Sequence, residues 1–329
     1  MTSVLVVGGT NFIGPEVVRS LVRRGTDVTV LHRGEHEDEL GDVRHIHADR
    51  ADLASHVAEI SPDVVLDMVP VHAAHAESVM AAAEADRAGR VVAVSSMDVY
   101  RGFDVVHRKE TTVQPVPFTE ESELRVHRYP YRSRFEPGDA MYDYDKIDVE
   151  ERVLGSVAVP GVVLRLPVVF GPKDRQHRLY GIARRIADGM PVIVMPEGLG
   201  VWRFGKAFRS NVADAIALGC VHPAAAGGIF NVGSFEGAEA EWTATVGAVM
   251  GWCGAVDTIP NATAPDDLLP DIDVRQHLVG DSGRIRRELG WVERVGLNQA
   301  IAETVEWELA NPPDDFHYDR DAELAAAGR

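Results

Sequence analysis

The start of the chain combines a short apolar strand, a glycine-rich turn, a helix and a second strand. Residues 3–7 are apolar, residues 8–14 read Gly-Gly-Thr-Asn-Phe-Ile-Gly, and the apolar residues of 16–24 have helical spacing. Residues 28–31 form the second apolar run. Strand, glycine turn, helix and strand within about thirty residues are the arrangement of a dinucleotide-binding site. In such a site the pyrophosphate rests on backbone N–H groups at the helix N-terminus. The sequence therefore predicts a dinucleotide site at this turn.

Three positions of the turn decide how closely a phosphate can approach. Gly8 permits a tight turn, and Gly14 allows the helix to pack close to the strand. Asn11 occupies the place where a third glycine would complete a Gly-x-x-Gly-x-x-Gly spacing. Asparagine is the non-glycine residue that best tolerates a positive φ, so the turn can survive this replacement.

Apolar runs and helical segments alternate along the first half of the chain. Further strands are predicted at 43–47, 63–67, 91–95 and 161–166, and helices at 52–60 and 73–88. This alternation predicts an α/β fold, a doubly wound parallel sheet with helices on both faces. Ligands of such sheets bind at the carboxyl ends of the strands. The residues at these ends are Asp49, Met68, Val69, Pro70, Ser95, Ser96 and Pro167.

The composition predicts a soluble globular protein and opposes nucleic acid as a partner. The 329 residues are 45% hydrophobic, and no apolar run reaches the length of about eighteen residues that a membrane helix needs. The chain enters its first strand at once, so we expect no signal peptide. Cys220 and Cys253 are too few for a disulfide framework, which favours the cytoplasm. The net charge of −18 opposes the phosphates of nucleic acids.

Histidines and cysteines give no pattern typical of a metal site. His72 and His75 lie three residues apart on a predicted helix, and no cysteine–histidine cluster has zinc spacing. We predict no metal and expect the two histidines to be helix residues near the cofactor.

A tyrosine and a lysine four residues apart suggest proton-transfer chemistry. On a helix, Tyr142 and Lys146 would share one face. A neighbouring ammonium favours the phenolate and makes a tyrosine a usable base. The hydroxyl of Ser96, which precedes Tyr142 by 46 residues, could hold the substrate oxygen. Taken alone the Tyr-x-x-x-Lys pattern is weak, and the alternative is a solvated helix face.

Seven stretches in order carry a family resemblance. They are GGTNFIG (8–14), VVAVSSMDVY (91–100), YDYDK (142–146), LRLPVVFGP (164–172), FRSNVADAIA (208–217), IFNVG (229–233) and RIRRELGW (284–291). The chain resembles the extended short-chain dehydrogenase/reductase family, in its nucleotide-sugar epimerase/dehydratase branch. The GGT-x-FIG turn is similar to that of an atypical subgroup, which includes chloroplast RNA-binding proteins that have drifted from catalysis.

The resemblance implies a Rossmann fold and assigns roles to the matching residues. Ser96, Tyr142 and Lys146 become the catalytic group, in which Tyr142 exchanges the proton, Lys146 lowers its pKa and Ser96 orients the oxygen. The residues implied to bind the cofactor are Gly8, Thr10, Asn11, Phe12, Ile13, Gly14, His32, Arg33, Asp49, Arg50, Met68, Val69, Pro70, Ser95, Tyr142, Lys146 and Pro167. For Asp49, the alternative is a helix cap or a turn residue.

Asp98 raises the question of dehydration. In sugar 4,6-dehydratases of the family, a glutamate two residues before the tyrosine that corresponds to Tyr100 takes a proton from the sugar. Asp98 is a shorter version of that group, and Met97 stands where the usual acidic neighbour would be. Dehydration is therefore half supported, and the alternative for Asp98 is a cap at the strand end.

The end of the second strand indicates the choice of cofactor. An acidic residue there would accept hydrogen bonds from the adenosine ribose and repel a 2′-phosphate. This chain has His32 and Arg33 instead, and the guanidinium of Arg33 could clamp the phosphate. We therefore favour NADP, while NAD remains open if Arg33 faces water or stacks on adenine.

The segment 101–141 is longer than the family usually has between the two catalytic elements. It is rich in charge, proline and aromatic residues, and we interpret it as a lid over the substrate. Its arginines, Arg125, Arg128, Arg132 and Arg134, would either meet an anionic group or form surface ion pairs with nearby glutamates. Further arginines in regions where relatives bind the nucleotide or its phosphates are Arg203, Arg209 and Arg275.

The pattern becomes irregular after Pro172. Segments with a helix or strand pattern are 174–189, 191–194, 211–221, 228–232, 241–250, 282–290 and 297–309, with a peripheral helix in 310–329. By resemblance, residues 1–171 form the NAD(P)-binding domain, with 208–235 packing back on it. Residues 172–329 mainly form the substrate-binding domain.

Three functions fit these features. The first is an NAD(P)-dependent epimerase or dehydratase acting on a sugar or nucleotide-sugar, with Tyr142 as acid/base. The second is an NADPH-dependent carbonyl reductase of a small metabolite. The third is a non-catalytic nucleotide- or RNA-binding protein, against which the intact Ser96, Tyr142 and Lys146 argue. The resemblance also implies a homodimer.

Overall fold

A seven-stranded parallel sheet forms the first part of the molecule in the computed structural model, which describes residues 1–34, 40 and 43–329. The strand order is β10-β6-β5-β4-β1-β2-β3. The strands are β1 (Ser3–Val7), β2 (Asp27–His32), β3 (Arg44–His47), β4 (Val64–Asp67), β5 (Arg90–Ser96), β6 (Gly161–Leu166) and β10 (Ile229–Asn231). The predicted doubly wound α/β fold is confirmed.

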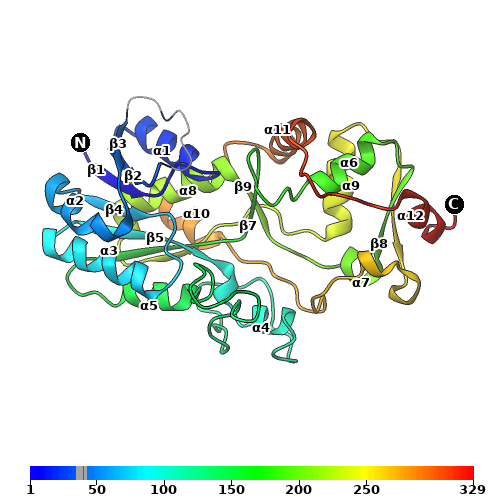
Figure 1. Ribbon diagram of the computed structural model, residues 1–329, viewed down its shortest axis with the longest axis horizontal. Coiled ribbons are helices and arrows are strands. Elements are labelled where there is room, and N and C mark those ends of the chain that lie inside the picture. Colours follow the sequence, from blue (N-terminus) through cyan, green and yellow to red (C-terminus); the bar gives the residue numbers. More distant parts are fainter. Residues whose placement is uncertain (35–39, 41–42) are drawn as a thin grey trace.

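Helices cover both faces of this sheet (Figure 1). One layer contains α1 (Gly14–Arg23), α8 (Arg209–Val221) and α10 (Gly283–Leu289). The other contains α2 (Leu53–Ile60), α3 (Ala73–Asp86) and α5 (Lys146–Leu154). Strand β1 contributes side chains to the hydrophobic cores on both faces of the sheet, because its alternate residues point to opposite faces. Val4 and Val6 pack against the first layer, and Leu5 and Val7 pack against the second.

Most of the remaining elements form a second lobe beside the sheet, at the right of Figure 1. Its two short parallel pairs are β7 (Val168–Phe170) with β9 (Lys206–Phe208), and β8 (Val192–Pro196) with β11 (Ala255–Ile259). Its helices are α6 (Tyr180–Ala187), α7 (Glu197–Gly200), α9 (Glu239–Val249), α11 (Leu297–Ala310) and α12 (Arg320–Ala326). The aromatic side chains of Phe170, Phe208 and Trp242 lie in the core of this lobe. Between the two lobes, the chain returns to the sheet through α8 and β10.

The helix predicted to include Tyr142 begins later in the chain than expected, so that prediction is wrong. Helix α5 begins at Lys146, and residues 141–143 form turns before it. The carboxylate of Asp145 is the cause, because it accepts a hydrogen bond of 2.9 Å from the N–H of Ile147 and caps the helix. Tyr142 and Lys146 therefore do not share a helix face.

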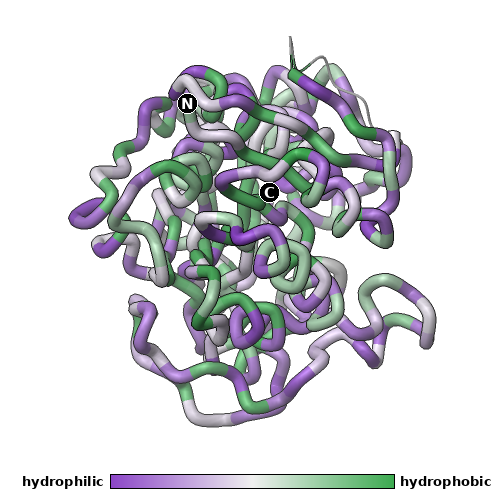
Figure 2. The backbone as a smooth tube through the Cα atoms, turned by 90° about the vertical axis from the view of Figure 1, so that its left-hand side faces the viewer, coloured by the Kyte–Doolittle hydropathy of each residue, from purple (hydrophilic) through white to green (hydrophobic). Residues whose placement is uncertain are grey.

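Other boundaries differ less. The helix predicted within 174–189 is α6, and a 3₁₀ turn (Arg50–Asp52) precedes α2. Strands β7, β9 and β11 had no counterpart in the sequence analysis; each is short and pairs with a distant segment. Hydrophobic segments gather inside the molecule, while many hydrophilic ones follow the outer loops (Figure 2). None of the helices in the described ranges is long and apolar enough to cross a membrane.

A buried ion pair links α5 to the sheet. Arg165 on β6 donates to both carboxylate oxygens of Glu150, at 2.6 and 3.0 Å, and the hydroxyl of Ser95 donates to the same group at 2.6 Å. Both charged side chains are almost fully buried. Removing one partner would leave the other charge uncompensated in a medium of low polarity.

We predict that Glu150→Gln lowers the free energy of unfolding by about 3–5 kcal/mol, because Arg165 loses its counter-charge. Urea unfolding at pH 7 measures this change. The matched control is Glu59→Gln, which breaks an exposed pair with Arg44 at 2.8 Å and should cost less than about 1 kcal/mol. Equal losses in the two variants would contradict the structural role of the buried pair.

Candidate active site

The glycine turn between β1 and α1 has the backbone shape that a pyrophosphate requires. Gly8 and Gly9 have φ angles of 89° and 94°, in the region that favours glycine. A Cβ atom on Gly14 would lie 2.4 Å from the Cα of Gly9, so only glycine permits this approach of helix to turn. The positive φ among the non-glycine residues of the turn falls on Phe12, at 46°, and not on Asn11.

The N-terminus of α1 can receive an anion. Its N-cap residue, Ile13, provides no side-chain hydrogen bond to the first N–H groups of the helix. N–H groups at a helix start carry a partial positive charge and suit a phosphate. The turn therefore fits a dinucleotide cofactor. Arg209, at the start of α8, reaches the same turn and contacts the carbonyl of Pro172 at 2.8 Å and Glu16 at 3.1 Å.

The predicted cofactor residues at the carboxyl ends of the strands lie along one edge of the sheet. Arg50 forms a two-fold ion pair with Asp67 at the end of β4, with distances of 2.6 and 2.8 Å. Asp67 also accepts from the N–H of Val69 at 3.1 Å. Asp49 caps the turn that follows it through the N–H of Ala51, at 3.0 Å. The cap considered for Asp49 is thus present, and its role near adenine stays a prediction.

His32 is buried at the end of β2. Its Nε2 lies 2.9 Å from Nδ1 of His45, and its Nδ1 accepts from the N–H of Gly34 at 3.1 Å. The ring also packs edge-on against His47. These contacts hold the His32 ring against β3, while the next residue, Arg33, is exposed.

Lys146 connects two strand ends. Its Nζ donates to the carbonyls of Pro70, at 2.8 Å, and Val94, at 2.9 Å. Burial lowers the pKa of Lys146 to about 8, and the carboxylates of Asp98 and Asp67 act in the opposite direction. A buried ammonium in this place makes the local electrostatic potential more positive. It therefore stabilises the deprotonated form of a proton-transfer group beside it.

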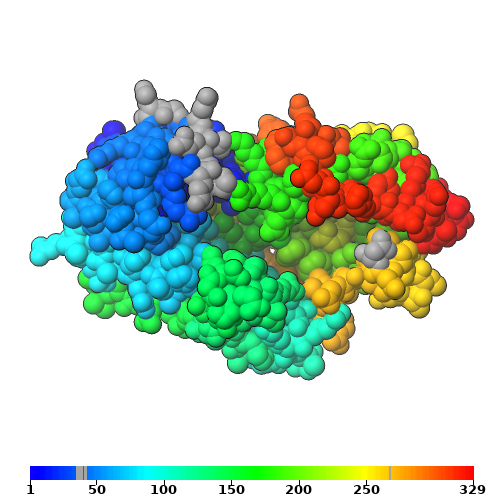
Figure 3. All heavy atoms as spheres, in the orientation of Figure 1, coloured from blue at the N-terminus to red at the C-terminus, as the bar shows by residue number. Residues whose placement is uncertain are grey.

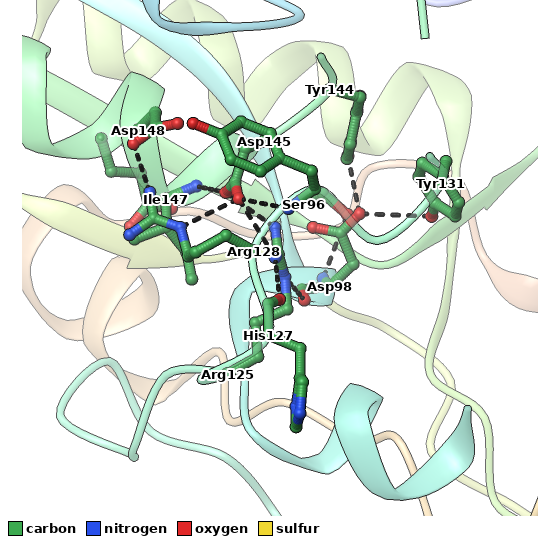
Figure 4. A network of polar contacts seen from close by, with 12 residues as sticks. Ser96, Asp98, Arg125, His127, Arg128, Tyr131, Tyr144, Asp145, Ile147 and Asp148 are labelled. Carbon is green, nitrogen blue, oxygen red and sulfur yellow. Dashed lines mark hydrogen bonds and ion pairs between the residues drawn. The ribbon is translucent and has the colours of Figure 1, made fainter. Parts of the chain in front are cut away.

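Ser96 and Asp98 follow the end of β5. The hydroxyl of Ser96 accepts from the N–H of Asp98 at 3.1 Å, so the serine caps the 3₁₀ turn Met97–Val99. Oδ2 of Asp98 accepts from the hydroxyl of Tyr144 at 2.7 Å and from that of Tyr131 at 3.4 Å (Figure 4). Burial raises the pKa of Asp98. The carboxylate of Asp98 is therefore part of a buried polar group, and the side chain that caps the strand end is that of Ser96.

The two tyrosines near Lys146 lie in different surroundings. Tyr142 is half-buried, and the guanidinium of Arg132 lies 5.1 Å from the centre of its ring. Tyr144 is buried, and Nζ of Lys146 lies 5.8 Å from the centre of its ring. Burial raises the pKa of Tyr144 well above its usual value, while a hydrogen bond with Ser96 acts in the opposite direction.

The structure thus brings Ser96, Asp98 and Lys146 together with Tyr144. Sequence reasoning missed Tyr144, although the pattern Tyr-x-Tyr-x-Lys contains both tyrosines. Tyr142 lies with Arg132 and Tyr129 in the turns before α5. Its catalytic role stays a prediction.

The arginines of segment 101–141 are mainly engaged in ion pairs. Arg125 and Arg128 both bind Asp145, at 2.8 and 2.9 Å, and Arg132 binds Asp143 at 2.6 Å. Arg128 also contacts Asp148. The partners are mostly aspartates near the start of α5, and the pair between Arg125 and Asp145 is buried. Arg134 is exposed.

The segment itself is packed along its length. It contains α4 (Gly102–Val106), and Phe118 forms a bridge with Gly280. The N–H of Gln114 donates to the side chain of Gln276 at 2.6 Å. The predicted lid is thus tied to a distant part of the chain, and its movement stays a hypothesis.

Two other predicted substrate arginines have local partners in the second lobe. Arg203 donates to the carbonyl of Glu236 at 2.8 Å, and Arg275 binds Asp273 at 2.9 Å. A hollow separates the two lobes on the face shown in Figure 3. No group of three or more metal-binding side chains suited to an ion occurs in residues 1–34, 40 and 43–329.

A parallel sheet whose first turn is shaped for a pyrophosphate, with a serine and a buried lysine at its carboxyl edge, defines a dinucleotide-binding Rossmann protein. The model of the NAD dependent epimerase/dehydratase family matches residues 4–233. The chain belongs to that family.

Known proteins similar to this chain agree with the family. A dTDP-glucose 4,6-dehydratase of Neisseria meningitidis serogroup B (strain ATCC BAA-335 / MC58) is 24% identical, with 94% of each chain covered. The solved structure of the epimerase Mth375 from Methanothermobacter thermautotrophicus has a TM-score of 0.68 at 18% identity, covering 94% of this chain and 93% of that one. MoeE5 in complex with UDP-glucuronic acid and NAD has a TM-score of 0.66 at 21% identity, covering 94% and 99%. At these identities the two structures support the fold alone.

Proposed function

We propose that the protein is an NAD(P)-dependent enzyme that acts on the sugar of a nucleotide-sugar by epimerase- or dehydratase-type chemistry. The observation that carries the proposal is the placement of Lys146. Its ammonium is fixed on the carbonyls of Pro70 and Val94, where β4 and β5 end, and Ser96 lies at the end of β5. The bound cofactor would accept a hydride from a sugar carbon and return it. Similar proteins named as nucleotide-sugar enzymes support the substrate class.

The chain's own residues would divide the remaining work. The turn at Gly8–Gly14 would hold the pyrophosphate, and the Ser96 hydroxyl would position the sugar oxygen. A tyrosine would exchange the proton of that oxygen. The sequence pattern predicts Tyr142 for this role, which would require the turns at 141–143 to place its hydroxyl beside Ser96.

Asp98 bears on the choice between epimerase and dehydratase. A dehydratase needs a group that removes a proton from a sugar carbon, and Asp98 is the residue that matches by position. In this structure its Oδ2 accepts from Tyr144 and Tyr131, so a direct role would need these contacts to change. This arrangement favours epimerase-type chemistry by hydride removal and return, which needs no group to take a proton from a sugar carbon.

We further propose that residues 172–329 mainly bind the nucleotide-sugar. The hollow between the lobes would receive it (Figure 3). Arg132, Arg203 and Arg275 would exchange their present partners for substrate phosphates, and Arg134 is already exposed. A homodimer stays a prediction from the family resemblance, and a cytoplasmic location stays a prediction from the small number of cysteines.

NADP is the cofactor we favour. Relatives were solved with NAD, but the end of β2 in this chain lacks the carboxylate that would repel a 2′-phosphate. The His32 ring is held by His45, so the exposed Arg33 is the residue placed to meet that phosphate.

We predict that Arg33→Ala weakens the binding of NADP by about tenfold, or ~1.4 kcal/mol, relative to NAD. Isothermal titration with each dinucleotide gives the ratio. Arg44→Ala is the control, since Arg44 is an exposed arginine on the neighbouring strand whose partner is Glu59. A wild-type protein that prefers NAD, or an unchanged ratio in Arg33→Ala, would reject the NADP assignment.

Mass spectrometry of small molecules released from the freshly purified, denatured protein tests the function. We expect a stoichiometric oxidised dinucleotide, because an enzyme that returns its hydride keeps its cofactor. A co-released sugar nucleotide would name the substrate class. An empty protein that binds added NADPH and consumes it once per turnover would point to a carbonyl reductase. A protein that binds no dinucleotide would support the non-catalytic alternative and reject the proposal.

A further inference from the structure

The geometry points to Tyr144 as the acid/base of the proposed reaction, with Asp98 as the group that takes and returns its proton. The inference rests on the proposed function for the identity of the substrate. It departs from the Tyr-x-x-x-Lys pattern, which designates Tyr142. The two assignments differ by two residues and can be separated by experiment.

The backbone before α5 explains why Tyr144 faces the site. Asp145 has extended dihedral angles, φ −156° and ψ 109°. In an extended segment, residues two apart point to the same side. Tyr144 and Lys146 therefore face the same way, with Nζ of Lys146 5.8 Å from the Tyr144 ring. Residues four apart share a face only on a helix, and α5 does not extend back to Tyr142.

Contacts of Asp145 fix this conformation. Its N–H donates to the carbonyl of Val71 at 3.1 Å, and its carboxylate accepts from Arg125, Arg128 and the N–H of Tyr129. Its side chain is fully buried. Because these contacts hold the Asp145 side chain, the side chains of its two neighbours point away from it, and the Tyr144 hydroxyl reaches Asp98.

Asp98 is suited to receive a proton from Tyr144. The hydroxyl of Tyr144 lies 2.7 Å from Oδ2 of Asp98. Oδ1 of Asp98 is buried and has no hydrogen-bond partner within the described part of the chain. Arg125 binds the main-chain carbonyl of Asp98, at 3.0 Å, and pairs with the carboxylate of Asp145. Asp98 is therefore a buried carboxylate without a direct ion pair, a state that favours protonation.

The surroundings of Asp98 also favour its protonated form. Burial and the charge of Asp145 raise the pKa of Asp98, and burial has the largest effect. The charges of Arg125 and Lys146 and the hydrogen bond from Tyr144 act in the opposite direction. Tyr131 faces the carboxylate from segment 101–141, at 3.4 Å. Asp104, His107 and Lys109 line the same small pocket as Asp98, beside Arg125 and Tyr131.

In the described part of the chain, no carboxylate accepts a hydrogen bond from the hydroxyl of Tyr142. Arg132 lies over the rings of Tyr129, at 3.8 Å, and Tyr142, at 5.1 Å, and its guanidinium binds the exposed Asp143. A cation beside a tyrosine favours the phenolate, but the ring of Tyr142 contacts Arg132 in the turns before α5. The contacts of Asp98, Lys146 and Ser96 are with Tyr144 instead.

The proton transfer balances. When a sugar carbinol is oxidised, its hydroxyl proton passes to the oxygen of Tyr144 as the phenolic proton of Tyr144 passes to Oδ2 of Asp98. An oxidised nicotinamide dinucleotide, when bound, would supply the acceptor for the hydride of the same carbon. The carboxylate of Asp98 would become a carboxylic acid as the nicotinamide lost its positive charge, so the net charge of the site would be unchanged. Returning the hydride reverses each transfer.

Three tyrosine variants test the assignment. Tyr144→Phe should lower kcat by at least about 100-fold, the range that a general acid–base group supplies, and by at least about tenfold more than Tyr142→Phe. Tyr318→Phe is the matched control, because its hydroxyl also donates to a carboxylate, Asp188 at 2.8 Å, but lies in the second lobe. Dinucleotide affinity, measured by titration, should be retained in all three. A larger loss in Tyr142→Phe than in Tyr144→Phe would overturn the inference.

A second measurement needs neither substrate nor cofactor. Infrared difference spectroscopy across pH follows the protonation of Asp98, with Asp98→Asn identifying its carboxyl band. Tyr144→Phe removes a hydrogen bond that stabilises the carboxylate, so the pKa of Asp98 should rise further, while Tyr142→Phe and Tyr318→Phe leave it in place. A band that does not respond to Tyr144→Phe would overturn the pair.

The two measurements separate the inference from the proposed function. If sugar nucleotides are not turned over by the wild-type protein, the proposed function fails, and the infrared titration still decides whether Asp98 and Tyr144 act as a pair. If turnover depends on Tyr142 and the Asp98 band ignores Tyr144, the inference fails and the proposed function stands.

Discussion

The buried carboxylate of Asp145 is the contact on which the candidate site depends. It accepts from the guanidinium of Arg125 at 2.8 Å, from Arg128 at 2.9 Å, and from the N–H groups of Tyr129 and Ile147, each at 2.9 Å. Burial alone would raise the pKa of Asp145, but hydrogen bonds and the charge of Arg125 hold it below its usual value. One side chain thus starts helix α5 and fastens the segment that precedes it.

Helix α5 connects the residues around Asp145 to the sheet. Lys146 and Glu150 lie four residues apart and face the same way. Lys146 binds the carbonyls at the ends of β4 and β5, and Glu150 binds Arg165 on β6 and Ser95 on β5. The candidate site is therefore bounded by one helix, which is pinned at its N-terminus to segment 101–141 and along its length to the sheet. Such double anchoring preorganises polar groups before a substrate arrives.

Much of the first lobe could be predicted from the sequence. Strands β1, β4, β5 and β6 are apolar runs buried on both faces, and the helices between them have the 3.6-residue period, so local patterns suffice. The glycine turn could also be predicted, because its glycines are needed for steric reasons. A Cβ atom on Gly14 would collide with the backbone of Gly9. Strands β7, β9 and β11 could not be predicted, because short strands are defined by distant partners.

The details of the site depend on contacts that a local pattern does not contain. Spacing alone placed Tyr142 and Lys146 on one helix face, whereas the helix start is set by Asp145 and by arginines 17 and 20 residues before it. The one local signal was Asp145 itself, an aspartate directly before a helical run, which is a typical N-cap. The position of Tyr144 beside Asp98 joins residues 46 apart in sequence.

The first structure to determine is a crystal structure of the protein with bound dinucleotide, because it shows where helix α5 begins. We expect α5 still to begin at Lys146, with Asp145 bound to Arg125 and Arg128. The Tyr144 hydroxyl would then lie between Asp98 and the space beside the nicotinamide. A helix that extends back through Tyr142 and places its hydroxyl beside Ser96 would contradict the account.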